Sequence, residues 1–215
     1  MPSPNFSAVI FDMDGVIIDS EPRHQRAFLE VFAQMGYGQT HGIQFERYLG
    51  RSDRAVWVDF IAQHKPKWTL DELIAWKQNH LIEIIRREQP IFNGLPELLA
   101  KLAPRYRLAV ASGSVHSVID EVLAMKGLRA FFPVVVSVQD VAHGKPAPDV
   151  FLRAAERLGV APAACCVIED SAAGVTAARA AGMTAIAITN TLPAEKLTQA
   201  QYLVRTYEEI GRLLA

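Results

Sequence analysis

The sequence is poor in cysteine, has no excess of charge of either sign and contains no long hydrophobic run. Its 215 residues include 2 cysteines, and a charged fraction of 21% leaves a formal net charge of -1. Without a basic tract, we expect neither a nucleic-acid-binding surface nor a polybasic membrane patch. No apolar run approaches the ~18 residues that a membrane-spanning helix needs. We therefore predict no nucleic-acid partner and no membrane partner, and we expect a monomer.

The two cysteines, Cys165 and Cys166, are neighbours inside an apolar run. Because a disulfide between adjacent residues is strained, we predict two reduced thiols in the core, which is typical of a cytoplasmic protein. The N-terminal segment has no basic residue, and acids at positions 12 and 14 interrupt its apolar run. This pattern does not fit a signal peptide, so we expect a cytoplasmic location.

What the sequence does contain is apolar material for a sizeable core, since 50% of its residues are hydrophobic. From about residue 90 onward, short apolar runs alternate with segments of helical character. The runs lie at 108–111, 134–136, 165–168 and 185–188, and an earlier one lies at 8–11. Such alternation is typical of right-handed βαβ units around a parallel sheet. The sequence thus predicts an α/β fold with a Rossmann-like parallel sheet.

Residues 20–88 have a different character, because apolar residues recur there at helical spacing and no strand is evident. Phe28 and Phe32, for example, belong to one stripe that would lie on a single face of a helix. The α/β pattern stops where this block begins and resumes where it ends. We therefore predict a discontinuous α/β core, 1–19 and 89–215, with an all-helical insert between its two pieces.

Two carboxylates and a glycine, Asp12, Asp14 and Gly15, come directly after the first apolar run. The run is typical of a strand buried on both faces, and ligands bind just past the carboxyl ends of parallel strands. Gly15 permits the sharp turn that a bulkier residue would resist. Taken alone, this short motif fits an acidic turn after a core strand equally well.

Two further stretches fall where a predicted strand ends or a predicted helix begins. Ser112-Gly113-Ser114 offers hydroxyl and backbone N–H groups that can seat phosphate oxygens, although such a triplet is also an ordinary helix cap. Lys145 lies between a glycine and two prolines, a rigid setting that is also found in a simple turn. Each stretch is a weak signal by itself.

Glu169 and Asp170 end another apolar run, and alone they would simply be charges that cap the next helix. If the strands are neighbours, these acids crowd Asp12 and Asp14 at one edge of the sheet. Carboxylates this close repel one another unless a cation or a proton intervenes. Oxygen ligands without His or Cys suit Mg²⁺, which commonly binds one or two carboxylates and a substrate phosphate. With Lys145 to hold the anion, the set predicts phosphoryl transfer.

These motifs, in this order, resemble those of the haloacid dehalogenase-like superfamily, and the resemblance covers essentially the whole chain. The motif residues are Asp12, Asp14, Ser112, Lys145, Glu169 and Asp170. The helical insert straight after the first motif resembles the cap of the β-phosphoglucomutase-like and sugar-phosphate phosphatase group. Dehalogenase members lack an acid two residues past the nucleophile, so Asp14 argues against carbon–halogen chemistry.

The resemblance implies a role for each matching residue. Asp12 would attack phosphorus and form an aspartyl-phosphate, and Asp14 would protonate the leaving oxygen and then activate water. Lys145 would neutralise both Asp12 and the phosphate. Mg²⁺ would rest on Asp12, the backbone carbonyl of Asp14 and Asp170, with Glu169 as a direct or water-mediated ligand. The phosphoryl group would be bound by Ser112, Gly113 and Ser114.

The cap, in the same resemblance, closes over the site and selects the substrate. His24 resembles a histidine at the cap hinge, although a partly buried histidine at a domain seam fits equally well. Arg51 lies in a loop that resembles one contacting substrate, and Lys77 is a further candidate. The alternative for both is a solvated charge. In the mutases an arginine is expected just after the serine of this loop, but Asp53 stands there. A clamp for a second phosphate is therefore in doubt.

We thus predict a Mg²⁺-dependent phosphomonoesterase that acts on a small phosphorylated metabolite, and we expect that metabolite to be a sugar phosphate. A phosphomutase of the β-phosphoglucomutase type is the second hypothesis, because it uses the same core residues and differs in the group that accepts the phosphoryl. A non-catalytic phospho-ligand-binding module is a third, from another class. The intact Asp14 and the full cap argue against it.

Overall fold

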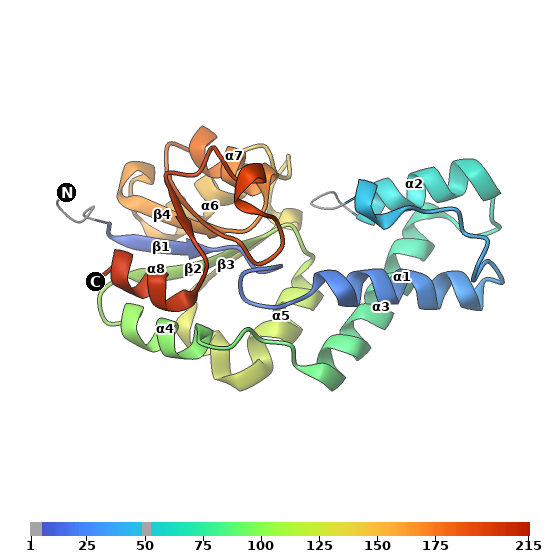
Figure 1. Ribbon diagram of the computed structural model, residues 1–215, viewed down its shortest axis with the longest axis horizontal. Coiled ribbons are helices and arrows are strands. Elements are labelled where there is room, and N and C mark those ends of the chain that lie inside the picture. Colours follow the sequence, from blue (N-terminus) through green and yellow to red (C-terminus); the bar gives the residue numbers. More distant parts are fainter. Residues whose placement is uncertain (1–5, 49–52) are drawn as a thin grey trace. The chain divides into compact units, whose positions relative to one another are not determined.

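The computed structural model describes residues 6–48 and 53–215, and the chain divides into two compact units. Unit 1 comprises Met1–Asp19 and Pro90–Ala215, and unit 2 is Ser20–Gln89. Unit 1 is therefore built from two pieces that are distant in sequence (Figure 1).

Unit 1 contains a 6-stranded sheet in the order β3-β2-β1-β4-β5-β6. Every neighbouring pair of strands runs in parallel, which confirms the predicted fold class. The strands are β1 (Ala8–Phe11), β2 (Arg107–Ser112), β3 (Val134–Ser137), β4 (Cys165–Glu169), β5 (Thr184–Ile188) and β6 (Tyr202–Val204).

β1 lies in the middle of this sheet, between β2 and β4. The loops that follow these three strands therefore meet at the carboxyl edge of the sheet. Phe11 stands opposite Val110 of β2 on one side and Ile168 of β4 on the other. All four residues of β1 are buried, as expected for a strand that is covered on both faces. The residues that follow β1, β2 and β4 are consequently neighbours, as the sequence argument requires.

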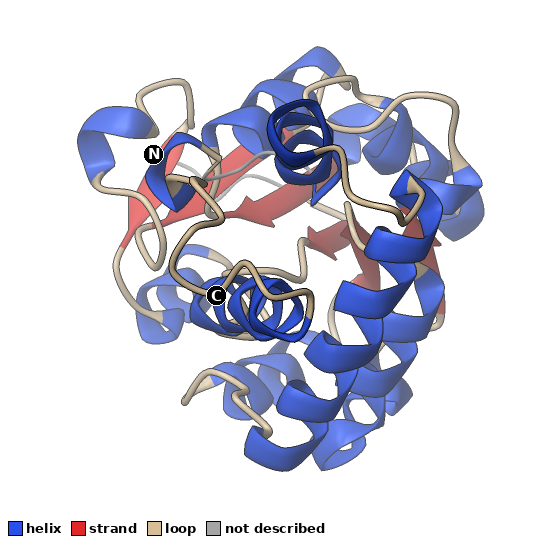
Figure 2. Ribbon diagram, turned by 90° about the vertical axis from the view of Figure 1, so that its right-hand side faces the viewer, coloured by secondary structure: helices blue, strands red, loops and turns tan. Residues whose placement is uncertain are grey.

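Helices cover both faces of the sheet, whose strands are drawn red in Figure 2. One face is packed by α6 and α7, whose apolar residues share a core cluster with Ala109, Val167 and Ala185. Figure 1 shows α4, α5 and α8 on the opposite side of the sheet. The helices are α4 (Leu95–Leu102), α5 (His116–Ala124), α6 (Asp149–Leu158), α7 (Ala172–Ala180) and α8 (Tyr207–Leu213). Short 3-10 helices in this unit are η2 (Met125–Phe131), η3 (Val138–Asp140), η4 (Pro162–Ala164) and η5 (Ala194–Lys196).

β4 carries both cysteines, and their side chains are buried free thiols. Burial raises the pKa of Cys165 to about 11 and raises that of Cys166 further. A thiol that stays protonated is a poor nucleophile and a poor metal ligand. The prediction of two reduced core thiols is confirmed.

The described residues of unit 2 form helices joined by loops and contain no strand; the helices are α1 (Glu21–Gln34), η1 (Phe45–Arg47), α2 (Asp53–His64) and α3 (Leu70–Glu88). Its core is a cluster of aromatic rings in which Phe28, Phe32 and Trp57 contact one another. α3 begins at a capping box, because the Thr69 hydroxyl accepts from the backbone N–H of Glu72 and the Glu72 carboxylate accepts from Thr69 N. Among the described helices of the whole chain, none combines the length and apolarity needed to cross a membrane.

Candidate active site

Three acids meet at the carboxyl edge of the sheet. Asp12 directly follows β1, Glu169 is the last residue of β4, and Asp170 comes next. Their ligand oxygens all lie within 4.8 Å of one another, and all three side chains are buried. Residues separated by more than 150 positions are thus brought together because β1 and β4 are adjacent. An acidic cluster of this kind can bind a divalent metal.

Lys145 is the cation of this cluster. Its Nζ donates to Asp12 Oδ1 at 2.6 Å and to Glu169 Oε1 at 2.7 Å, and the side chain is only 12% exposed. The lysine stands in the segment between η3 and α6, beside the ring of Phe151. One ammonium group therefore serves a cluster of three carboxylates, and negative charge is left in excess.

The pKa values reflect this excess. Burial raises the pKa of Asp12 to about 7; the Lys145 ammonium opposes the shift, and the nearby Glu169 and Asp14 carboxylates add to it. Burial and the neighbouring Glu169 and Asp12 carboxylates raise the pKa of Asp170 well above its ordinary value. Burial alone would lower the pKa of Lys145, but Asp12 and Glu169 outweigh it and hold the pKa above its usual range. The site is thus one in which a divalent cation would relieve repulsion.

Two glycines allow the acids to come this close. A Cβ atom on Gly15 would lie 1.7 Å from Asp170 Oδ2, and Gly15 also has a positive φ of +74°. A Cβ atom on Gly174 would lie 1.7 Å from Glu169 Oε1. No side chain fits at either position without displacing a carboxylate, which explains why the turn after β1 and the start of α7 need glycine.

Glu169 is the most heavily bonded of the three acids. While Oε1 accepts from Lys145, Oε2 accepts from Asp170 N and Ser171 N at 2.8 Å and from Ser171 Oγ at 2.9 Å. Glu169 thereby fixes the lysine and the beginning of α7. Its role as a direct or water-mediated metal ligand stays a prediction, and the occupied oxygens favour the indirect form.

The loop after β2 supplies hydroxyl groups on the other side of β1. Ser112 is buried, and its Oγ accepts from the backbone N–H of Ser114 at 3.0 Å. Ser114 Oγ in turn donates to Asp14 Oδ2 at 2.8 Å. Gly113 is exposed, and a Cβ atom there would meet no other atom within 4 Å. The predicted phosphate-binding triplet therefore lies beside the first motif, with Ser114 in contact with Asp14.

Three residues outside the predicted motifs support the site from the C-terminal part of unit 1. Asn190 Nδ2 donates to the carbonyl of Gly15 at 2.8 Å, and Tyr207 Oη donates to the carbonyl of Val16 at 2.6 Å. The Thr191 side chain is hydrogen-bonded to Asp170. Asn190 and Thr191 lie just past the end of β5. Polar residues directly after the apolar run at 185–188 are therefore the sequence feature that indicates them.

Comparison with known proteins places this arrangement in a family. The family model described as haloacid dehalogenase-like hydrolase matches residues 6–182, which include all the motif residues. The chain belongs to the haloacid dehalogenase-like hydrolases. The resemblance predicted from the motifs is thereby confirmed.

Relatives of this hydrolase include named sugar-phosphate phosphatases. It is 35% identical over 181 residues to the fructose-1-phosphate phosphatase YqaB of Escherichia coli, covering 84% of this chain and 95% of that protein. It is 33% identical over 183 residues to hexitol phosphatase B of the same organism, covering 84% and 82%. The fold is shared with β-phosphoglucomutase from Clostridium difficile, at a TM-score of 0.80 and 24% identity over 97% of each chain.

Unit 2 of the hydrolase has a buried ionic cluster around Lys77. The lysine is 0% exposed, and its Nζ donates to Asp53 Oδ2 at 2.7 Å and to His24 Nδ1 at 2.6 Å. The alternative that Lys77 is a solvated charge is therefore wrong. Its position explains this, because Leu73 and Leu81, four residues before and after it, are buried on the same stripe of α3. The predicted contact residue Arg51 lies outside the described residues.

Asp53 is held in its charged form by this cluster. Burial would raise the pKa of Asp53, but the Lys77 ammonium and the neighbouring His24 outweigh it and hold the pKa well below its usual range. The carboxylate also accepts from Gln78 Nε2 at 3.2 Å. A small cavity of about 40 Å³ adjoins the cluster within unit 2. Its lining consists of Glu21, His24, Gln25, Phe28, Phe45, Tyr48, Asp53 and Val56.

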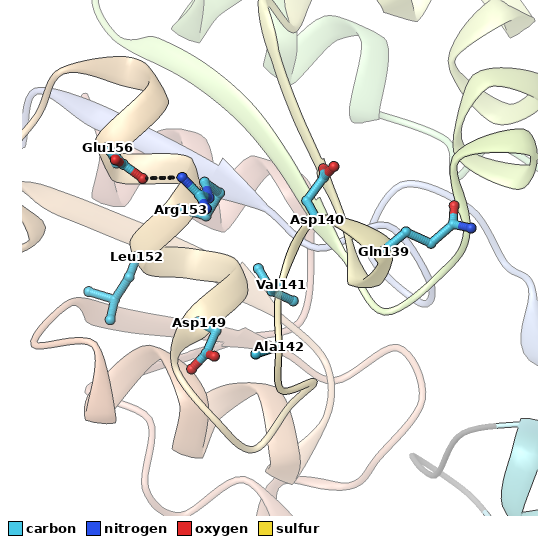
Figure 3. A pocket seen from close by; sticks show the side chains of 8 residues that line it. All are labelled: Gln139, Asp140, Val141, Ala142, Asp149, Leu152, Arg153 and Glu156. Atoms are coloured by element: carbon cyan, nitrogen blue, oxygen red, sulfur yellow. Dashed lines mark hydrogen bonds and ion pairs between the residues drawn. The ribbon is translucent and has the colours of Figure 1, made fainter.

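A larger surface hollow of about 720 Å³ in unit 1 is lined by none of the motif residues. Figure 3 shows its lining on α6 and on the segment that contains η3. The lining residues are Gln139, Asp140, Val141, Ala142, Asp149, Leu152, Arg153 and Glu156. None of the three clustered acids is among them, and Arg153 is already paired with Glu156 at 2.8 Å. The hollow is therefore distinct from the candidate active site.

Proposed function

We propose that the protein is a Mg²⁺-dependent phosphomonoesterase that hydrolyses a small sugar phosphate through an aspartyl-phosphate on Asp12. The observation that carries this proposal is the buried cluster in which Lys145 contacts both Asp12 and Glu169. Because Lys145 donates to Oδ1 of Asp12, we propose Oδ2 as the oxygen that attacks phosphorus. The family membership supports the same chemistry.

The donor set around Asp12 fits Mg²⁺. Asp12 and Asp170 would hold the ion together with the backbone carbonyl of Asp14, and Glu169 would act mainly through Lys145. Three carboxylates and one ammonium group leave an excess of negative charge that a divalent cation balances, and the donors are all oxygen. When bound, Mg²⁺ would supply positive charge to the phosphoryl oxygens.

The chain's own residues account for both halves of the reaction. In the first half, Asp12 Oδ2 forms a bond to phosphorus while the ester oxygen leaves with a proton from Asp14. In the second half, Asp14 takes a proton from a water molecule, and the resulting hydroxide displaces Asp12 and yields inorganic phosphate. Lys145 neutralises the nucleophile and the transferred group throughout. Ser112 and the backbone of Gly113 are proposed to hold the phosphoryl oxygens.

The choice of hydrolysis over phosphoryl transfer to a second sugar rests on Asp53. A mutase must hold a sugar bisphosphate in two orientations, and an arginine is expected at this position for the second phosphate. Here the position is occupied by a carboxylate, which is already bound to the buried ammonium of Lys77. An anionic group would meet a charge-balanced pair rather than a cation. The relatives named as fructose-1-phosphate and hexitol phosphatases favour the same choice.

A phosphate-release assay tests the proposal. The purified protein with Mg²⁺ is incubated with p-nitrophenyl phosphate, fructose 1-phosphate and a hexitol phosphate, and EDTA is added in a parallel series. We expect release of inorganic phosphate that EDTA abolishes. Conversion of β-glucose 1-phosphate into glucose 6-phosphate in the presence of a trace of the bisphosphate would identify a mutase instead. No metal-dependent turnover of any ester would leave a non-catalytic phospho-ligand module.

A further inference from the structure

We propose that Ser114 is a positioning residue that orients the carboxyl group of Asp14 for proton transfer, rather than a ligand of the substrate phosphate. This inference rests on the proposed phosphatase function. Its direct basis is the hydrogen bond from Ser114 Oγ to Asp14 Oδ2 at 2.8 Å, between residues 100 positions apart in the chain. Both residues are partly buried, so water competes only weakly for this bond.

The hydroxyl of Ser114 distinguishes the two oxygens of Asp14. In the acid form of a carboxyl group the carbonyl oxygen is a better hydrogen-bond acceptor than the hydroxyl oxygen. While Ser114 donates to Oδ2, the arrangement with the transferable proton on Oδ1 is therefore favoured. One oxygen thus anchors the side chain and the other exchanges the proton, in the first half of the reaction with the leaving group and in the second with water.

Ser114 can act in this way because its own backbone is held on two sides. Its N–H donates to Ser112 Oγ at 3.0 Å, and its carbonyl accepts from Ser137 Oγ at 2.7 Å. Ser137 is 0% exposed and is the last residue of β3, directly opposite Ser112 in the sheet register. The loop that carries Ser114 is thereby fixed to the ends of two neighbouring strands.

Contacts between the start of α5 and η3 further fix the loop that carries Ser114. The backbone N–H of His116 donates to Gln139 Oε1 at 2.9 Å, and His116 Nε2 lies 3.1 Å from Asp140 Oδ1. Gln139 N donates to Ser137 Oγ at 3.1 Å, so the hydroxyl that holds Ser114 is itself oriented. Figure 3 shows Gln139 and Asp140 side by side on η3. A loop this constrained is suited to aim a side chain, because catalytic geometry must be held within a fraction of an ångström.

The test compares two esters that differ in their need for a proton. p-Nitrophenolate leaves readily without one, whereas a sugar alkoxide requires general acid catalysis. With Ser114→Ala we expect kcat for fructose 1-phosphate to fall by about 10- to 100-fold with KM nearly unchanged, less than the 10²–10⁴ typical of a lost acid–base group. With p-nitrophenyl phosphate the first half-reaction stays fast and the second slows. A burst of p-nitrophenolate equal to the enzyme concentration is therefore expected in stopped flow.

Matched variants separate the hydroxyl from the space it occupies. Ser114→Thr keeps the hydroxyl group, and Ser114→Val has nearly the shape of the Thr variant but no hydroxyl. We therefore expect the Thr variant to retain most of the wild-type activity and the Val variant to behave like Ser114→Ala. Ser117→Ala, at an exposed serine of α5, serves as the control and is expected to behave as the wild type. Circular dichroism verifies the fold of each variant.

Two results would overturn the inference. A rise in KM for both esters with kcat unchanged would make Ser114 a phosphate ligand, and equal rates for the wild type and Ser114→Val would remove any role of the hydroxyl. Both results leave a working phosphatase, so they are distinct from failure of the proposed function, in which the wild type itself releases no phosphate from either ester.

Discussion

Two lysines of this hydrolase are almost fully withdrawn from solvent, Lys145 in unit 1 and Lys77 in unit 2, and each donates to a carboxylate at 2.6–2.7 Å. Around Lys145 the carboxylates outnumber the cation, and the pKa of Asp12 rises to about 7. Around Lys77 one carboxylate balances one ammonium group, and the pKa of Asp53 falls. The same ion pair thus occurs in two opposite electrostatic settings.

The difference teaches where chemistry is to be expected. A buried cluster with uncompensated charge destabilises the fold by itself and is retained where a ligand supplies the missing charge. A balanced buried pair is costly to break but gives a ligand ion little to bind. We therefore expect loss of the first cluster to affect turnover most and loss of the second to affect stability most.

The strongest test of this contrast is Asp12→Asn. The substitution removes the nucleophile, so we expect turnover of p-nitrophenyl phosphate to fall by at least about 10⁴-fold. Because it also removes one of the crowded carboxylates, the melting temperature of the metal-free protein is expected to stay the same or to rise. Steady-state kinetics and thermal denaturation in EDTA measure the two effects. An active Asn variant would eliminate the covalent step.

Lys145→Ala tests the role of the ammonium group in the first cluster. Without the ammonium group, Asp12 and the transferred phosphoryl lose their fixed counter-charge, and we expect kcat to fall by about 10²- to 10³-fold. Inorganic phosphate should also inhibit the variant more weakly, which a competition assay measures. Lys101→Ala, at an exposed lysine of α4, is the matched control and should be indistinguishable from the wild type. A Lys145 variant with ordinary turnover would show that the buried ammonium has no part in the reaction.

Lys77→Met is expected to lower the stability of the fold rather than the rate of turnover. Met fills a similar volume but leaves Asp53 without its counter-ion, so we expect the free energy of unfolding to fall by about 3 kcal/mol. Urea denaturation followed by tryptophan fluorescence measures the loss, because all three tryptophans belong to unit 2 and Trp57 is buried there. In the double variant with Asp53→Asn, the two losses should be smaller than additive, because the partners interact directly. Additive losses would mean that the pair is not coupled.

Much of this architecture follows from local patterns in the sequence. The run at 8–11 reads as a strand buried on both faces, and β1 is that strand. The acids and the lysine could be assigned to one sheet edge because polar residues directly after buried strands meet there in any parallel sheet. In contrast, β6 and α8 have 3 and 7 residues and carry too few apolar positions for a clear period. They are fixed by packing against β5 and α4 instead.

The partners of individual side chains were beyond the sequence pattern. Lys77 lies on the apolar stripe of α3, but only the fold shows that Asp53, 24 positions away, reaches it. Likewise, a serine in Ser112-Gly113-Ser114 can bind phosphate, cap a helix or contact another side chain. The hydrogen bond from Ser114 to Asp14 depends on the order of β1 and β2 in the sheet and on the brace from Ser137. Long-range contacts of this kind are decided by topology, not by local composition.

The smallest effect that separates the two clusters is the acid dependence of stability. Because the pKa of Asp53 is lower in the folded protein than in the unfolded chain, the folded state binds fewer protons at acidic pH. The contribution of the Asp53 charge to stability is therefore present above the ordinary aspartate pKa of about 4 and is lost as the pH falls below that value. Urea denaturation at pH 6, 5, 4 and 3 gives the free energy of unfolding of the wild type and of Asp53→Asn. We expect the difference between these two free energies to shrink as the pH falls. Glu83→Gln, at an exposed carboxylate of α3, is the control and should leave the pH profile unchanged. A difference that stays constant over this range would mean that Asp53 stabilises unit 2 by its shape and hydrogen bonds and not by its charge.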